Sequence, residues 1–186
     1  MESRSTIRTS LTEFFEPRVA QAARVQGAPL DPAVARYLSC VLADAATPEG
    51  GPPAETFAEL RAAAVTAPPR EAPARWRRLG EGALVVAGCF TPALSRRNVS
   101  RGYCAAMGAS AFGVLGVLAA PPARAVFGEV ATTFEACADV LALAGQDGDD
   151  SDELLRLWTA WRATRSPRLA ACLRARGVAP EGEGSA

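Results

Sequence analysis

The sequence predicts an all-α fold, a single-domain bundle of about seven or eight helices with a buried central helical pair. Apolar residues recur at three- and four-residue spacing along most of the chain, which is the period of an amphipathic helix. No segment alternates apolar and polar residues for long enough to form a strand. Proline and glycine separate the periodic segments, and a chain of 186 residues buries about 70% of its unfolded surface.

The first helix is expected to begin at Ser10, after a disordered stretch over residues 1–9. Ser10 and Glu13 have the spacing of a capping box, in which two side chains satisfy free backbone N–H groups at a helix start. Pro17 lies inside the helical pattern and predicts a kink or a split, because proline has no N–H to donate.

The second and third helices are delimited by proline. Asp31 and Pro32 predict the start of the second helix, since aspartate is a favoured N-cap and proline suits the first helical position. This helix is expected to end near Ala45. A loop rich in proline and glycine follows, and the third helix is expected over residues 54–67.

Helices four and five, expected over residues 73–90 and 99–119, form the central pair. Within helix four, Gly80, Gly82 and Gly88 each lower the helix propensity by up to about 1 kcal/mol relative to alanine. These glycines predict that a neighbouring helix approaches closely. Helix five carries apolar residues on all sides, which predicts that it is buried.

The run from Gly102 to Pro122 is also long enough to be considered as a membrane span, which takes about 20 apolar residues. Its many glycines and alanines and its Ser110 make it only moderately hydrophobic. Small residues of this kind favour close helix packing. We therefore expect a buried helix of a soluble protein, with no membrane span.

Three more helices are expected after the central pair. A sixth covers residues 122–144, a seventh lies around residues 154–161, and an eighth covers residues 166–177. The helical domain is thus expected over residues 10–179. The remaining residues, 180–186, are expected to form a flexible tail.

The acidic segment 146–151 precedes the seventh helix. Its alternating side chains resemble the first ligands of a calcium loop, but Trp158 stands where such a loop requires a carboxylate. Asp150 and Glu153 have instead the spacing of an N-cap and the third helical residue. We expect no metal site.

The composition excludes several kinds of catalysis. The chain has no histidine, and all 20 of its basic residues are arginine. Acid–base catalysis by histidine, nucleophiles activated by histidine and lysine Schiff bases are therefore excluded. The formal net charge is zero and aromatic residues do not interleave with the arginines, which disfavours nucleic acid as a partner. No cofactor and no catalytic residue is predicted.

The five cysteines are far apart in the sequence, and their number is odd. This pattern argues against a disulfide framework and against a site of four thiolates. Each cysteine falls on or near an apolar helix face, where it behaves as a small hydrophobic residue. No apolar signal segment follows the polar first residues. We expect a reducing, cytoplasmic location.

Arginines near both ends of helix four are the first candidate binding residues. Arg77 and Arg78 precede its apolar part, and Arg96, Arg97 and Arg101 follow it. Guanidinium groups bind phosphates and carboxylates with paired hydrogen bonds. Because helix four is roughly 25 Å long, the two groups are expected at opposite ends as solvated side chains. An anion or partner site is the alternative.

Glu81 and two tryptophans are the other candidate binding residues. Glu81 lies in an apolar stretch, so a buried position requires a partner, most simply an arginine, or a raised pKa. An ion pair is preferred to a catalytic acid, because no second carboxylate or histidine lies nearby in the sequence. Trp158 and Trp161 share one helix surface and are expected in the core. An exposed tryptophan would instead indicate a partner surface.

A set of mostly apolar and glycine residues forms a pattern along the chain: Leu79, Gly80, Glu81, Leu84, Gly88, Phe90, Tyr103, Met107, Gly108, Phe112, Leu157, Trp161, Leu173, Gly177 and Pro180. This pattern resembles a group of uncharacterised all-helical bacterial proteins. The similarity covers about residues 11–180 and implies only a bacterial, cytoplasmic, helical fold, without a function or a site residue.

The function expected from the sequence is non-enzymatic. A helical bundle is expected to act through protein–protein association, as a homo-oligomer or with another protein. The alternative is a small-molecule sensor or carrier with an apolar pocket between helices four, five and six, where glycine and alanine leave room. A third hypothesis, an enzyme that uses Glu81 with arginines, lacks a partner for proton transfer.

Overall fold

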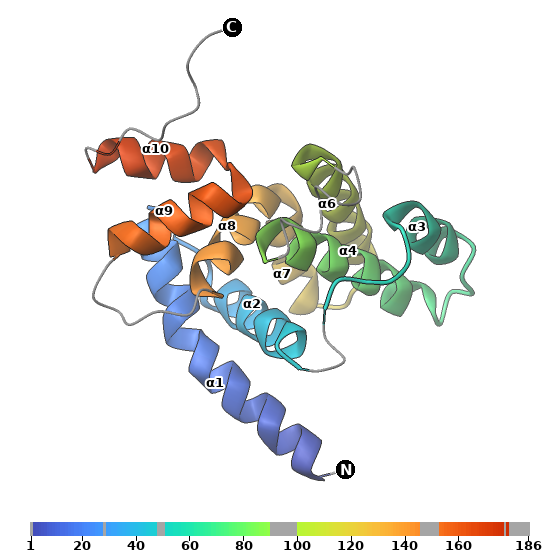
Figure 1. Ribbon diagram of the computed structural model, residues 1–186. Helices are drawn as coiled ribbons and strands as arrows, with labels where there is room; N and C mark the ends of the chain where they lie inside the picture. Colours follow the sequence, from blue (N-terminus) through green and yellow to red (C-terminus); the bar gives the residue numbers. More distant parts are fainter. Residues whose placement is uncertain are drawn as a thin grey trace, which may run out of the picture.

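The computed structural model of the protein describes the backbone of residues 2–27, 29–47, 51–89, 100–145, 153–176 and 178. Every regular element within these ranges is a helix, which confirms the predicted all-α class. Figure 1 shows their arrangement. The helices are α1 (Glu2–Val25), α2 (Pro32–Ala45), α3 (Phe57–Val65), α4 (Ala72–Gly88), α6 (Arg101–Leu118), α7 (Ala123–Thr132), α8 (Phe134–Ala144), α9 (Glu153–Thr164) and α10 (Pro167–Ala175).

The first helix differs from the prediction. α1 begins at Glu2, so the stretch expected to be disordered is helical backbone, and Ser10 lies inside the helix rather than at its cap. Pro17 is also inside α1, which therefore is not split in two. The second half of α1 packs along α2 and α8, and Val19 in this half is fully buried. Tertiary packing outweighs the missing hydrogen bond of the proline.

Side-chain caps start the next two helices. Asp31 Oδ1 accepts a hydrogen bond from Ala33 N at 2.8 Å, which confirms the predicted cap of α2. α3 begins at Phe57, a little later than expected, because Thr56 and Glu59 form a capping box. Each of these caps satisfies backbone N–H groups that have no partner within the helix.

α4 and α6 form the central pair, and they pack on each other more extensively than any other two described helices. The glycines of α4 make room for neighbours, as predicted. A Cβ atom on Gly88 would lie 2.7 Å from the carbonyl oxygen of Ala138 in α8, and one on Gly80 would lie 3.0 Å from the Phe112 ring in α6. Only the absence of a side chain allows these approaches.

α6 is buried on one side only, which corrects the prediction that it is sheltered all round. Cys104, Met107, Ala111 and Leu115 face the core, whereas Val117 on the opposite side is 77% exposed. By length and composition α6 also passes the test for a membrane span, as many core helices do, and it is the one described helix that does. The apolar sequence did not distinguish its two sides, because glycine, alanine and serine occupy both.

The segment expected as helix six is two helices. α7 ends at Thr132 and α8 begins at Phe134, with Thr133 between them at φ −113° and ψ 22°. The Thr133 hydroxyl donates to the carbonyl oxygen of Glu129 at 2.7 Å. A threonine side chain that bonds the preceding turn in this way favours a bend in a helix. Nearly all of α8 is buried, so this helix lies in the interior of the bundle.

α9 and α10 pack on each other and cover α8 at one end of the molecule (Figure 1). Ser166 caps α10 by accepting a hydrogen bond from Leu169 N, as its Ser-Pro start predicts. Four expectations lie outside the described residues. They are the end of helix four at Phe90, the cap at Asp150, the end of helix eight at Gly177 and the tail over 180–186.

Candidate binding sites

Glu81 is held by a half-buried tyrosine. The Tyr37 hydroxyl of α2 donates a hydrogen bond to Glu81 Oε1 of α4 at 2.7 Å. The Tyr37 ring packs edge-on against Phe112 and Phe127, with centroids 6.1 Å and 5.6 Å apart. Burial, with the nearby Glu81 carboxylate, raises the pKa of Tyr37 well above its ordinary value. The hydroxyl therefore stays protonated and remains a donor to Glu81.

A hollow of about 370 Å³ opens beside this pair, between α2, α4 and α7. Arg36 of α2 and Arg77 of α4 both line it, and neither forms an ion pair with any residue that the structure describes. The Arg77 guanidinium lies 5.4 Å from the centre of the Phe127 ring, a cation–π distance. Asp44 and Glu81 bring negative charge to the same hollow. The hollow is therefore lined by apolar side chains together with charged side chains of both signs.

A second hollow continues from the first toward residues 51–54 and measures about 620 Å³. The two share Val41, Asp44, Arg77 and Glu81 as lining residues, so they are neighbouring parts of one depression along α2 and α4. Both hollows are open to solvent, which suits binding at a surface rather than enclosure of a substrate.

Aromatic rings fill the space that glycine leaves where α4 meets α6 and where α6 meets α8, and a hollow of about 580 Å³ lies among α6, α7 and α8. Between α4, α6 and α8, the Phe112 ring occupies the space over Gly80, and the Phe134 ring occupies the space over Gly108. Both phenylalanines are buried. The glycines therefore accommodate aromatic rings, and the space near Tyr37 lies instead between α2, α4 and α7.

Of the charged candidate residues, Arg77, Arg78 and Glu81 line the second hollow together. Arg78 forms two hydrogen bonds with the Glu55 carboxylate, at 2.7 Å and 2.9 Å. Arg101 pairs with Asp139 of α8. Arg96 and Arg97 lie outside the described residues. An anion site made from both arginine groups is therefore not assembled by the described part.

Asp139 is a buried charged residue that was not predicted from the sequence as part of a site. Its side chain is fully buried, pairs with Arg101 and accepts a hydrogen bond from Ser166 Oγ at 2.7 Å. Burial raises the pKa of Asp139, and the positive charge of Arg101 opposes this shift. The network joins α6, α8 and the cap of α10. A signal was present, because Asp139 is the one charged residue between Glu135 and Asp147.

The two tryptophans belong to the packing of α9. Trp161 is buried and Trp158 is half-buried against the core, with ring centroids 5.2 Å apart. The Arg165 guanidinium lies 4.5 Å from the centre of the Trp161 ring and covers it. Neither indole stands out from the surface, so this pair matches the structural interpretation rather than a partner surface.

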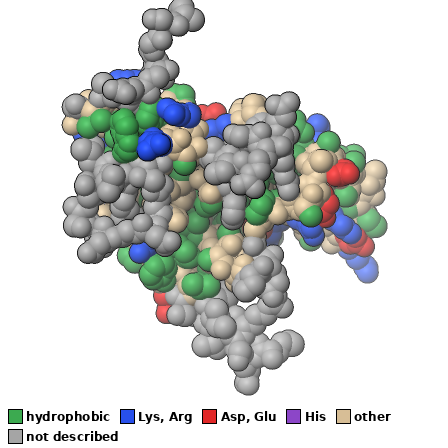
Figure 2. Space-filling view, in the orientation of Figure 1, with side chains coloured by type: hydrophobic (Ala, Val, Ile, Leu, Met, Phe, Trp, Pro, Cys, Tyr) green, Lys and Arg blue, Asp and Glu red, His purple; other side chains and the backbone are tan. Residues whose placement is uncertain are grey.

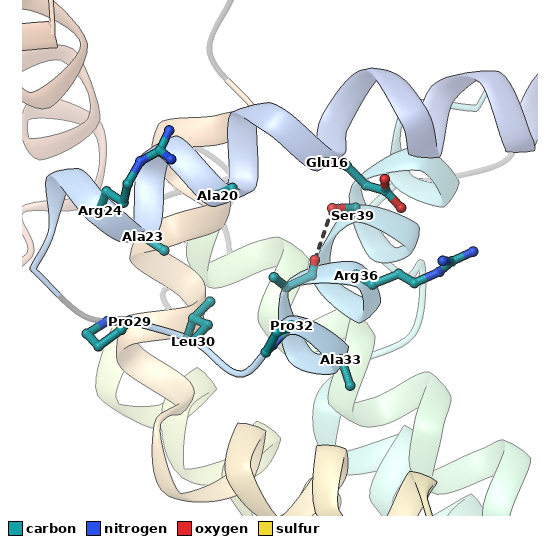
Figure 3. A pocket seen from close by; sticks show the side chains of 11 residues that line it. Glu16, Ala20, Ala23, Arg24, Pro29, Leu30, Pro32, Ala33, Arg36 and Ser39 are labelled. Carbon is teal, nitrogen blue, oxygen red and sulfur yellow. Dashed lines mark hydrogen bonds between the residues drawn. The ribbon is translucent and has the colours of Figure 1, made fainter.

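A groove of about 680 Å³ lies between α1 and α2 (Figure 3). Its floor consists of alanines such as Ala20 and Ala23, and Glu16, Arg24 and Arg36 stand around it. The Ser39 hydroxyl is turned inward and donates to Ala35 O at 3.0 Å, so it offers little to a ligand. Figure 2 shows mainly hydrophobic and uncharged side chains over the middle of this side of the molecule.

A further surface lies on the solvent side of α6, which we call the outer face of α6. It contains no charged residue, because the sequence has none between Arg101 and Arg124. Three of the five large hydrophobic side chains that are exposed in the described part belong to this helix: Tyr103 at 41%, Val117 at 77% and Leu118 at 49%. The outer face is defined by Tyr103, Ala106, Ser110, Gly113 and Val117, all exposed.

Comparison of the chain with models of protein families, with curated proteins and with solved structures finds no match. The resemblance to all-helical bacterial proteins therefore remains a prediction. Within the described residues, no three of the cysteine, aspartate and glutamate side chains are grouped in a way that would hold a metal ion.

Proposed function

We propose that this protein acts by binding a protein partner through the outer face of α6, and not by catalysis. The bacterial cytoplasm is the proposed setting, since five unpaired cysteines suit a reducing compartment. The observation that carries the proposal is the missing charge on the solvent side of an 18-residue helix. A helix at the surface of a monomer ordinarily presents polar and charged residues to water.

Exposed apolar surface has an unfavourable free energy in water. A partner that covers this surface removes that cost. Burying apolar surface contributes about 25 cal/mol per Å², so Val117 and Tyr103 each gain when another surface covers them. Contiguous exposed apolar patches on soluble proteins commonly mark interaction sites. The aromatic Tyr103, near the start of α6, is the residue type most often found at binding hot spots.

The hollow at Tyr37 supports binding more than chemistry. Glu81, its central carboxylate, already accepts the hydrogen bond of a tyrosine that stays protonated. Cys40 is the one thiol in the lining of this hollow, and the chain has no histidine to activate it. A general acid or base needs a pKa near the working pH and a partner for its proton.

Site-specific photo-crosslinking tests the proposal. A photoreactive phenylalanine analogue at Gly113 has room, because a Cβ atom there meets nothing within 4 Å. In the producing cell it is expected to yield a discrete protein adduct, whereas the same group at the exposed Ala171 of α10 yields none. Adducts with lipid only, or adducts of equal yield at both positions, would contradict a protein partner on α6.

A second candidate function is the binding of a small acidic molecule in the hollow between α2, α4 and α7. The specific observation is that Arg36 and Arg77 both line the hollow without an ion pair among the described residues, beside the Phe127 ring. An aromatic carboxylate would place its charge on a guanidinium and its ring against apolar side chains. Benzoate is expected to raise the melting temperature of the wild type but not of Arg77→Gln. No shift for the wild type removes this candidate.

A further inference from the structure

We infer that the hollow among α6, α7 and α8 is a binding site for a free α-amino acid with an apolar side chain. This hollow measures about 580 Å³, which lies within the range of sites for small molecules. The inference goes beyond the proposed function, because it assigns a small ligand to a hollow beside the outer face of α6. It is carried by apolar walls, two carboxylates and one guanidinium that line the same hollow.

The walls of the hollow are apolar, and small residues of α6 leave its space open. Ala105 and Ala109 line the hollow from α6, and both pack partly against the core. The half-buried Leu30, which precedes α2, and the buried Phe134, at the start of α8, line it as well. A ligand in the hollow therefore meets apolar side chains from several elements.

Two carboxylates line the hollow from either side of the bend at Thr133. Glu129 belongs to α7 and Glu135 to α8. In one continuous helix, residues six positions apart would point in directions about 120° apart. The bend between α7 and α8 therefore helps both carboxylates to reach the same hollow. Neither forms an ion pair with a described residue, although Glu129 Oε1 accepts a hydrogen bond from Asp31 N at 3.2 Å.

Arg168, in the first turn of α10, supplies the positive charge of the hollow. Its Nε lies 3.9 Å from Asp139 Oδ2, and Asp139 also accepts the hydrogen bond of Ser166, the cap of α10. The Arg168 side chain is 47% exposed. The contact with Asp139 engages one edge of the guanidinium and leaves its two Nη groups for a ligand carboxylate.

This combination of charges matches the two charged groups of an amino acid. Glu129 and Glu135 attract an ammonium group, while a guanidinium binds a carboxylate with paired hydrogen bonds. A ligand with a carboxylate alone would face two like charges. A ligand with an ammonium alone would not use Arg168. The apolar walls favour an apolar side chain, because a charged one would lose its hydration there.

Ligand-detected NMR titration with phenylalanine tests the site. Phenethylamine and hydrocinnamate are the comparison probes, since each keeps the ring but lacks one of the two charges. The wild type is expected to bind phenylalanine about tenfold or more tightly than either probe, because each missing charge removes a charge-assisted hydrogen bond. Arg168→Gln and Glu135→Gln are each expected to weaken the binding of phenylalanine by about tenfold.

The matched controls are Arg162→Gln on α9 and Glu71→Gln, at exposed residues outside the lining of the hollow. Both are expected to bind phenylalanine as the wild type does. Ala109→Leu fills the hollow without changing its charge and is expected to abolish binding. Circular dichroism checks that each variant is folded.

Three results overturn the inference. They are a wild type that does not bind phenylalanine, a probe with one charge that binds as tightly as phenylalanine, and variants Arg168→Gln and Glu135→Gln that bind as the controls do. Crosslinking from Gly113 to a protein does not depend on an amino acid in this hollow. The proposed function therefore survives if that crosslink forms while phenylalanine fails to bind.

Discussion

Single buried polar groups fix how the helices meet, and Asp139 is the clearest case. Its carboxylate joins Arg101, whose side chain is 17% exposed, to the cap of α10 through Ser166. Asp139→Ala leaves the guanidinium without its partner inside the protein. The free energy of unfolding is expected to fall by about 3 kcal/mol or more, as for other broken buried pairs. Urea denaturation followed by circular dichroism measures the change.

An exposed pair provides the control for this variant. Glu71→Ala removes the partner of Arg75, and both side chains of that pair are more than half exposed. The expected loss is below about 1 kcal/mol, because water screens such pairs. Equal losses for Asp139→Ala and Glu71→Ala would show that the buried network does not hold the helices together.

Tyr37 makes a second residue-scale prediction. Tyr37→Phe keeps the ring between Phe112 and Phe127 but removes the hydrogen bond to Glu81. A loss of about 1–3 kcal/mol in unfolding free energy is expected, because a partly buried carboxylate loses this hydrogen bond. If Glu81→Gln in the Tyr37→Phe background changes stability as much as it does in the wild type, the two side chains are not coupled.

Buried thiols predict the alkaline behaviour of the protein. Burial raises the pKa of Cys137 to about 11 and that of Cys89 to about 12, from an ordinary value of 9.0. The folded state therefore keeps protons that the unfolded state releases. This contribution to stability is complete below pH 9. It is lost as the pH rises through the pKa values that the two thiols have in the folded state. In urea denaturation, Cys137→Ala is expected to lose less stability than the wild type between pH 9 and 11. Parallel pH profiles would contradict this assignment.

Among whole elements, α6 shows most directly how glycine serves two different purposes. At Gly108 an added Cβ would collide with the Phe134 ring, so Gly108→Ala is expected to destabilise the protein by about 1–3 kcal/mol. At Gly113 the space is open, so Gly113→Ala is expected to stabilise the monomer by up to about 1 kcal/mol through helix propensity. Opposite signs in thermal denaturation support the packing described, and equal signs contradict it.

The helices themselves were largely predictable, because caps and prolines act locally. Asp31 and Ser166 were recognised as starts, and both cap their helices. Ser10 has an equally good capping pattern, yet α1 continues through it. The division at Thr133 was missed, since the apolar period runs on across it and the deciding hydroxyl bond depends on the folded backbone.

The candidate sites were less predictable, because they depend on contacts between distant segments. Glu81 was selected for its apolar surroundings, but Tyr37, its hydrogen-bond donor, lies 44 residues away. Asp139 was overlooked although it interrupts an apolar helix in the same manner. The sequence predicts burial on every side of α6, because its small residues give no sign of which side meets water.

At the scale of the whole molecule, the bundle presents an uncharged face of α6 to solvent. Its interior is filled by aromatic rings such as Phe112 and Phe134, and acidic and basic side chains gather where α3 and the start of α4 lie (Figure 2). Within the described residues, the exposed side of α6 is one part that this packing leaves uncovered. Association of the intact molecule, rather than turnover of a substrate, is therefore the property to measure.

Capture of the chain from the producing cell, compared between the wild type and Gly113→Arg, tests this claim most directly. The wild type is expected to recover a discrete protein partner, either a second copy of the chain or another protein, whereas the folded Gly113→Arg variant recovers none. A wild type that recovers no protein, or a Gly113→Arg variant that recovers the same partner, would contradict the role assigned to the outer face of α6.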